Sequence, residues 1–276
     1  MRFDRLEYIQ NEFPGSPNTL VIDGNGQVGY ESHSNEATPK VPEIGTWRMS
    51  LRADTMDTLR KLLDSPPINS LPDHWGRLRP GEDSRRIRVV AGSDTVEKLV
   101  GYREPVDPGM QKVIDALDQI VVEAQTHPLN VMRIALEQPS VSPDRVLSIT
   151  LSLSNPGSEP LTCRNVATMI GESDGQLSFQ AWPDKPRSEL KSEELLVLSP
   201  TSIKDTSPDG NSRSTPACLE LLPGKSISRL IRLPFASSTT GGYLIRAVYM
   251  NPATQLEGHP VLAGELYSLP IPVTIP

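Results

Sequence analysis

Hydrophobic residues recur at helical spacing between residues 107 and 125. Apolar side chains follow one another there at three- and four-residue steps, at Met110, Ile114, Leu117, Val121 and Ala124. Polar side chains fall mostly between them, so one side of the segment is apolar. Asp107 can cap the first turn, and Pro108 occupies a place where a missing N–H costs nothing. The pattern predicts an amphipathic helix that needs a sheet or another helix against its apolar side.

The chain before this helix alternates strand-like and helix-like patterns. Met56, Leu59, Leu62 and Leu63 predict a second helix, with Asp54 as its N-cap. Strands are predicted from apolar–polar alternation and turn residues, over residues 3–10, 19–23, 27–32, 45–51, 85–92, 95–102 and 129–137. These elements predict a first domain of the α+β class over residues 1–138, an antiparallel sheet with two helices.

A change of composition follows this first domain. Residues 139–145 are rich in proline and serine, and they predict a short linker. Beyond it, residues 146–276 contain roughly eight strand-like segments separated by turn residues, a spacing typical of an antiparallel sandwich. The whole chain is therefore predicted to be α+β, with a β-sandwich as its second domain.

Three segments of the second half carry a resemblance to a known family. A first strand closes on Ser154-Asn155-Pro156-Gly157, a later turn reads Leu222-Pro223-Gly224-Lys225-Ser226, and a strand follows over Gly242–Tyr249. In this order they resemble the immunoglobulin-like β-sandwich accessory domains of bacterial proteins. The resemblance covers about 130 residues, and it implies an immunoglobulin-like fold without implying any activity.

The first half is similar to small uncharacterised bacterial α+β domains. The turn over residues 24–30, the helix around Leu59 and the strand–turn–strand from Arg86 to Tyr102 carry this similarity. Such domains have no assigned chemistry, so the similarity implies none here.

The net charge and the lengths of the apolar runs limit which partners and which cellular compartment we expect for this protein. The 276 residues include 34 acidic and 27 basic side chains, a net charge of −7. A nucleic-acid partner is not expected, because binding phosphates needs a positive surface, and a protein partner attracted by charge would be basic. The chain contains neither an apolar signal segment nor a run long enough to span a bilayer, so we expect a cytoplasmic protein without a membrane partner. Cys163 and Cys218 fit no metal or redox spacing and are interpreted as small core residues, with a disulfide as the alternative.

No familiar catalytic or metal-binding motif occurs in the chain. Nucleophile elbow, phosphate loop, dinucleotide fingerprint and paired-histidine zinc motifs are all missing, so we predict no catalytic residue, no metal and no cofactor. Asp23 and Asn25 have the spacing that starts a calcium loop, but a hairpin turn is the favoured interpretation. His74 with Asp73 and Asp83 could form a base and its orienting group, although solvated loop residues are the simpler interpretation.

An arginine-rich segment is the most unusual local composition of this acidic chain. Its candidate binding residues for a protein partner are Trp75, Arg77, Arg79, Arg85 and Arg86. Arginine and tryptophan are enriched at binding hot spots, and guanidinium groups also suit small anions. The simpler alternative is that Arg86 and Arg88 line the outward side of a strand whose inward residues are Ile87 and Val89.

These observations favour a non-catalytic protein-binding protein, most of all a bacterial immunity protein or inhibitor that occludes a toxin or an enzyme. One alternative is a hydrolase with an unrecognised site near His74 and an accessory β-sandwich. Another is a structural or adaptor module whose edge strands, such as residues 243–250 or 266–275, accept a partner strand.

Overall fold

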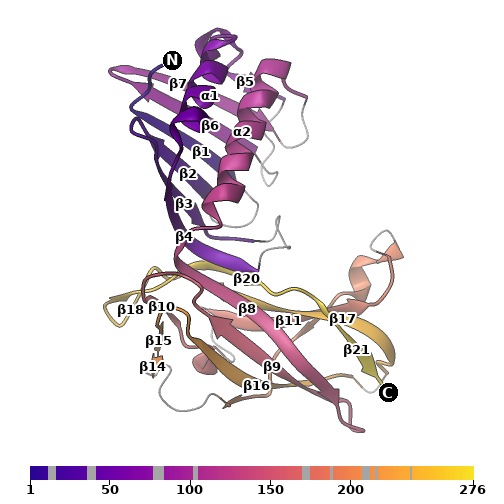
Figure 1. Cartoon of the computed structure of the whole chain (residues 1–276). Coiled ribbons are helices and arrows are strands. Elements are labelled where there is room, and N and C mark those ends of the chain that lie inside the picture. The colour runs from indigo at the N-terminus through magenta and orange to yellow at the C-terminus, as the bar shows by residue number, and fades with distance from the viewer. Residues whose placement is uncertain are drawn as a thin grey trace. The chain divides into compact units, whose positions relative to one another are not determined.

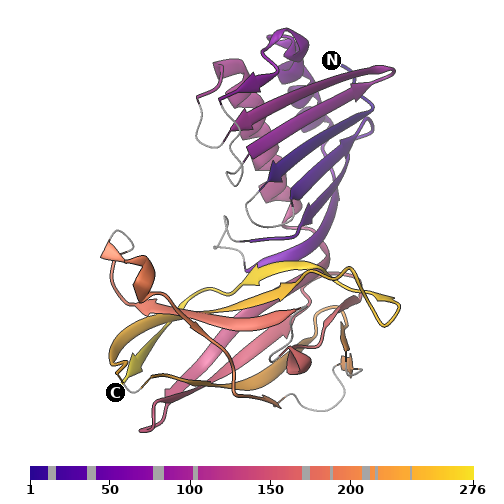
Figure 2. The same ribbon diagram turned by 180° about the vertical axis from the view of Figure 1, so that it is seen from behind.

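The protein is described by a computed structural model, shown in Figure 1 and, from behind, in Figure 2. The structure describes residues 1–11, 17–35, 42–76, 84–101, 105–169, 175–186, 189–206, 212–214, 217–236 and 238–276. The chain divides into two compact units. Unit 1 comprises Met1–Ser34 and Gly45–Leu129, and unit 2 comprises Asn35–Ile44 and Asn130–Pro276. The chain therefore passes between the units three times.

The fold is mostly β, which corrects the predicted α+β class with an immunoglobulin-like sandwich. Strands make up 53% of the structure and helices 17%, and the sheets are large and mixed. The prediction underestimated the strand content in part because residues 139–145 were interpreted as a linker, whereas strand backbone continues to Val141. A parallel pair between His74–Trp75 and Asp94–Gly101 makes the sheet of unit 1 mixed.

Unit 1 contains a single sheet with two α-helices. Its strands lie in the order β4-β3-β2-β1-β6-β7-β5. Their bounds are β1 Arg5–Asn11, β2 Asn18–Asp23, β3 Gln27–Ser32, β4 Glu43–Ser50 (which begins in unit 2), β5 His74–Trp75, β6 Ser84–Ala91 and β7 Asp94–Gly101. The helices are α1 Ala53–Asp64 and α2 Pro108–Ala124, and a short 3-10 turn covers Ile68–Ser70. Both views show α1 and α2 on the same face of this sheet (Figures 1 and 2).

Helix α2 forms where the sequence predicts it. The Asp107 side chain accepts a hydrogen bond from the Gly109 amide at 2.7 Å, which satisfies one of the free N–H groups of the first turn. The apolar stripe, extended by Val113 and Ile120, is buried. The start of α1 differs from the prediction, because Arg52 is its N-cap residue and Asp54 lies inside the first turn.

Unit 2 is built almost entirely from strands. One set runs in the order β13-β16-β9-β8, with β8 Pro128–Val141 (which begins in unit 1), β9 Val146–Ser154, β13 Ser202–Asp205 and β16 Ser226–Pro234. A second sheet runs β12-β11-β17-β20, with β21 also on β17; the bounds are β11 Gln176–Pro183, β12 Leu196–Leu198, β17 Gly241–Asn251, β20 Gly264–Tyr267 and β21 Ile271–Ile275. Smaller sheets join β10 Leu161–Arg164, β15 Cys218–Leu221 and β14 Ser212–Ser214, and β18 Gln255–Leu256 with β19 His259–Pro260.

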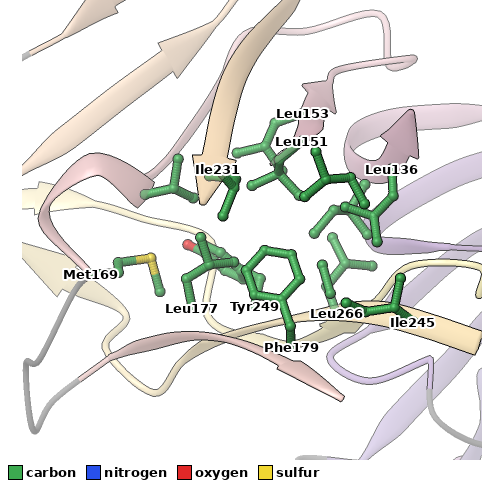
Figure 3. Close-up of a cluster of buried hydrophobic side chains, with 14 of the residues drawn as sticks. Leu136, Leu151, Leu153, Met169, Leu177, Phe179, Ile231, Ile245, Tyr249 and Leu266 are labelled. Atoms are coloured by element: carbon green, nitrogen blue, oxygen red, sulfur yellow. The ribbon is translucent and has the colours of Figure 1, made fainter. Parts of the chain in front are cut away.

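The core of unit 2 lies between its two larger sets of strands. Figure 3 shows Leu151 and Ile231 of one set facing Phe179 and Tyr249 of the other. These side chains belong to one continuous buried cluster that also takes in Met169. Burial of this apolar surface, at about 25 cal/mol per Å², is the main favourable contribution to the stability of this unit.

The division of the chain differs from the predicted domains 1–138 and 146–276. The contact boundary falls between residues 129 and 130, and residues 35–44 belong to unit 2. The predicted linker 139–145 is instead the end of β8 and a tight turn, in which the Arg145 amide donates to the Ser142 carbonyl. The register of β8 shifts between Glu137 and Ser140, and this irregularity accommodates Pro139 within a strand.

The predicted edge strands are only partly edges. Strand β17, which contains residues 243–250, pairs with β11 on one side and with β20 and β21 on the other. It is therefore a central strand. The side-chain amide of Asn35 donates to the Tyr267 carbonyl at 2.9 Å and accepts from the Tyr267 amide at 2.7 Å. Asn35 thus occupies the outward backbone groups of Tyr267, at the end of β20.

Neither helix among the described ranges is long and apolar enough to cross a membrane.

Cys163 and Cys218 are both free and buried, so the structure favours the core interpretation over the disulfide. They lie on the paired strands β10 and β15, where Cys163 is opposite Leu219 and Cys218 is opposite Arg164. Adjacent positions along a strand project to opposite faces, so the two thiols do not face one another. Burial, with a smaller contribution from Cys218, raises the pKa of the Cys163 thiol to about 12.

We expect neither thiol to react in the folded protein. A reagent must reach the sulfur atom, and both cysteines are buried. Titration with a chromogenic disulfide reagent should detect no fast-reacting thiol in native buffer and both cysteines in concentrated urea. A fast-reacting thiol under native conditions would contradict the burial of these residues.

Candidate functional site

The arginine-rich segment lies in unit 1, on and beside strands β5 and β6. Trp75 is half-buried in β5, while Arg85 and Arg86 are consecutive residues of β6. Arg77 and Arg79 fall outside the described residues. Because successive side chains of a strand project to opposite faces, Arg85 and Arg86 lie on different sides of the sheet. The predicted binding residues therefore do not form a single surface.

Arg85 faces helix α2. Its guanidinium Nη2 lies 3.4 Å from the Asp118 carboxylate. The buried Tyr8 hydroxyl donates to the same carboxylate at 2.7 Å, and the Gln10 amide donates to it at 3.1 Å. Asp118 thus links α2 to β1 and β6, and Arg85 has a structural role in this cluster. Burial, reinforced by the negative charge of Asp118, raises the pKa of Tyr8 well above its ordinary value.

Arg86 lies on the face of the sheet that the helices leave uncovered. The register places Glu7 of β1 opposite Arg88 of β6, and Arg88 opposite Glu97 of β7. Oppositely charged side chains therefore alternate across three strands. We call this set, Arg5, Glu7, Arg86, Arg88 and Glu97, the charged ladder. The simpler prediction for Arg86 and Arg88, an outward strand face with Ile87 and Val89 buried, is confirmed.

The ion pairs of the charged ladder differ in their exposure to solvent. Arg5 lies 2.7 Å from Glu7, Arg88 lies 3.7 Å from the other oxygen of Glu7, and Arg86 lies 3.7 Å from Glu97. The three arginine side chains are roughly half exposed. Arg86 and Glu97 are both partly exposed, and a pair in such surroundings is worth about 0–1 kcal/mol. Arg86 can therefore exchange Glu97 for a group of another protein at little cost, whereas Arg5 and Arg88 share Glu7, whose side chain is only 15% exposed.

A pocket of about 490 Å³ lies at the β7 edge of the same sheet. It is lined by Asn69, Asp73, His74, Thr95, Val96, Glu97, Lys98 and Leu99. The Lys98 side chain is only 1% exposed, and its ammonium donates to the Leu71 carbonyl at 2.7 Å and to the Asp73 carboxylate at 2.8 Å. The hydrogen bond and charge of Lys98 lower the pKa of Asp73 below its ordinary range.

This arrangement differs from the predicted base and orienting group. Asp73 and His74 both line the pocket, but the hydrogen bond to the Asp73 side chain comes from Lys98, and Asp83 lies outside the described residues. Sequence reasoning missed Lys98. The sequence does place Lys98 at the same alternation as the apolar Val96 and Val100, which marks it as a residue on the side of β7 that the helices cover.

A second, polar pocket of about 600 Å³ lies where β2 turns into β3, with Arg2, Asp4, Asp23 and Arg60 in its wall. The Asp23 carboxylate accepts hydrogen bonds at 2.9 Å from the backbone amides of Asn25 and Gln27. The favoured hairpin interpretation is confirmed, since this carboxylate closes the turn. Within the described ranges, no three His, Cys, Asp or Glu side chains gather to hold a metal ion.

Unit 2 carries an arginine held between aromatic rings. The Arg246 guanidinium carbon lies 4.4 Å from the Tyr267 ring centroid and 5.6 Å from that of Trp182, and its Nε donates to Gln180 at 2.8 Å. The alternation of β17 places Arg246 on the side opposite the buried Ile245 and Ala247. These residues are far apart in the sequence, so no local pattern predicts that they form a cluster.

Comparisons with known proteins identify no relative of established function. No protein-family model matches the chain, and no curated protein does. One matching solved structure is described as "AvmM Catalyzes Macrocyclization in Alchivemycin A Biosynthesis". It is 14% identical, has a TM-score of 0.28, and is matched over 51% of this chain and 87% of that chain. A likeness at this TM-score carries no argument about fold or activity.

Replacing Tyr8 by phenylalanine should lower the free energy of unfolding by about 1 kcal/mol at neutral pH, because it removes one buried hydrogen-bond donor to Asp118. The folded-state pKa of Tyr8 is raised, so its stabilising effect is fully present below pH ~10 and is lost as pH rises further. Urea unfolding of both proteins from pH 7 to 11 measures this difference. The Tyr243→Phe variant is the matched control, since the Tyr243 hydroxyl makes no hydrogen bond among the described residues. A constant difference across this range would contradict the cause assigned to the pKa of Tyr8.

Proposed function

We propose that this protein is a non-catalytic, cytoplasmic protein-binding protein, namely a bacterial immunity protein or inhibitor that neutralises a toxin or an enzyme by occluding it. The observation that carries the proposal is the charged ladder on the uncovered face of the unit 1 sheet. A broad face with close, alternating charges suits recognition of another protein surface, because charges of both signs fix the orientation of a partner.

Exposure and exchangeability support a role for Arg86 in this face. Arginine combines a large apolar contact area with directional donors, and it is enriched among residues that dominate binding energies. Among the described residues Arg86 is held by a partly exposed ion pair with Glu97, so a partner carboxylate can replace Glu97 without leaving a buried charge unpaired.

The net charge of −7 indicates that the expected partner carries a net positive charge. Long-range attraction depends on the whole charge of the protein and favours a basic partner, whereas the arginines of the ladder act at close range. The expected partner surface is therefore basic overall and contains carboxylates that meet the ladder.

The pocket beside His74 favours one alternative, a hydrolase. A base at His74 would use the roughly 490 Å³ of space next to it, with Asp73 and Lys98 in the wall. A screen of ester, amide and phosphate substrates with the intact protein and the His74→Ala variant tests this reading, and His74-dependent turnover would favour it over the binding protein.

The proposed function predicts a stoichiometric complex that depends on Arg86. The intact protein, immobilised in lysate of its own source, should capture a partner that is then purified and titrated by calorimetry. Arg86→Glu should weaken the complex at least about tenfold, as expected for a charge reversal at an interface.

Arg232→Glu is the matched control, because Arg232 is an exposed strand arginine of unit 2. Equal affinities of all three proteins would exclude the charged ladder as the binding surface, and the lack of any near-equimolar complex would refute the proposed function.

A further inference from the structure

Strand β7 is an open edge over most of its length. On one side it pairs with β6 from Asp94 to Gly101. On the other side its partner is β5, which among the described residues reaches only Leu99 and Val100. The stretch from Asp94 to Lys98 therefore has a strand neighbour on one side only within the part of the chain that the structure describes.

The register shows which backbone groups point outward along this edge. The β6–β7 hairpin has a two-residue loop, Gly92-Ser93, closed by Ala91 opposite Asp94. Such a closing pair is hydrogen-bonded, and bonded pairs then alternate with non-bonded pairs along the hairpin. Val96 and Lys98 thus bond to β6, while Thr95, Glu97 and Leu99 direct their N–H and C=O groups away from it. The Leu99 amide donates to the Asp73 carbonyl at 2.9 Å, which agrees with an outward direction of the Leu99 backbone groups.

The pocket of about 490 Å³ lies along this open edge. Thr95 and Glu97, whose backbone groups point outward, both line it, and Asn69 and Asp73 form the opposite wall. The chain before β5 leaves the edge at Asp73 because Lys98 binds the Leu71 carbonyl and the Asp73 carboxylate on the helix-covered side. Space for an added strand is therefore combined with two donors and two acceptors of Thr95 and Glu97 that have no backbone partner among the described residues.

The exposed charges around the edge are mainly negative. Asp73 is 83% exposed, and Asp94 and Glu97 are also exposed. The Lys98 side chain is 1% exposed, and its ammonium is already bound to the Leu71 carbonyl and the Asp73 carboxylate. On the neighbouring strand, Arg86 lies 3.7 Å from Glu97, and Arg88 is opposite Glu97 in the register. An extended segment with basic side chains complements this rim.

We propose that the open edge of β7 binds an extended, basic segment of a partner protein by strand addition, with Thr95 and Glu97 supplying the backbone hydrogen bonds. Main-chain bonds give such sites their affinity, and the flanking side chains give them selectivity. The inference rests on the proposed function, since it states how part of a protein partner is held.

Amide hydrogen exchange by NMR tests this site with a defined probe, an acetylated and amidated heptapeptide of alternating valine and lysine at millimolar concentration. In the free protein the Thr95 and Glu97 amides should exchange fast, while those of Val96 and Lys98 are protected by β6. The peptide should slow exchange at Thr95 and Glu97 by at least about tenfold, as expected for one added hydrogen bond each.

Two further peptides separate strand addition from charge attraction. The same peptide with every amide N-methylated keeps its charges, but its methyl groups keep it from approaching a strand edge closely enough to pair. A valine–glutamate peptide keeps the backbone but reverses the charge. Neither should protect Thr95 and Glu97. Equal protection by the N-methylated peptide, or no protection by the unmodified one, would overturn the proposal.

Variants of β7 give a second test. Thr95→Pro removes the outward N–H without removing a bond to β6, and it should weaken binding of the valine–lysine peptide roughly tenfold. Thr95→Val is the matched control, because it keeps the N–H and should bind as the parent does. Glu97→Lys, which preserves the backbone, should weaken the basic peptide and strengthen the acidic one, so the proposal stays testable if the proline variant fails to fold.

The two proposals fail in different ways. A purified partner complex that forms with unchanged affinity in Thr95→Pro and Glu97→Lys would overturn the edge site and leave the proposed function standing. Peptide protection at Thr95 and Glu97 without any cellular complex would refute the immunity or inhibitor role and support the edge site alone.

Discussion

The helices cover only one face of the unit 1 sheet, and this constraint decides which side chains of unit 1 are exposed. Two helices bury one face, and the alternation of side chains along each strand then fixes the environment of every residue. Arg85 and Arg86 are neighbours in the chain, yet the first is bound to Asp118 under α2 and the second belongs to the charged ladder. An arginine-rich composition thus serves two purposes, one that holds the helix in place and one that leaves charge available to solvent.

The buried ammonium of Lys98 has a comparable effect on the sheet edge. A lysine withdrawn from water needs acceptors, and it finds them in the Leu71 carbonyl and the Asp73 carboxylate. Satisfying one side chain in this way draws the chain before β5 toward the helix-covered side. Among the described residues the stretch Asp94–Lys98 has a strand neighbour on one side only, so the polarity of one core position contributes to the shape of this edge.

Local features of this fold could be predicted from the sequence, and features made by distant residues could not. Helix α2 and the turns at Asp23 and Gly92 follow from spacing and capping within a few residues. The mostly β class was missed because Pro139 argues for a linker, whereas a register shift allows β8 to continue through it. The contact between Arg85 and Asp118 joins two elements separated by 33 positions, and no local pattern reveals that pair. Arg86 was correctly placed on an outward strand face, but its sharing of that face with Glu7 depends on strand order.

The bond between Asn35 and Tyr267 affects the order of events during synthesis. The two residues are 232 positions apart, and both belong to unit 2. A ribosome that has added Asn35 adds Tyr267 only 232 residues later. Unit 1 has all its residues once Leu129 is made, so it can fold while unit 2 still lacks its last strands. Contacts of such long range form slowly in general, so we expect unit 2 to close after unit 1.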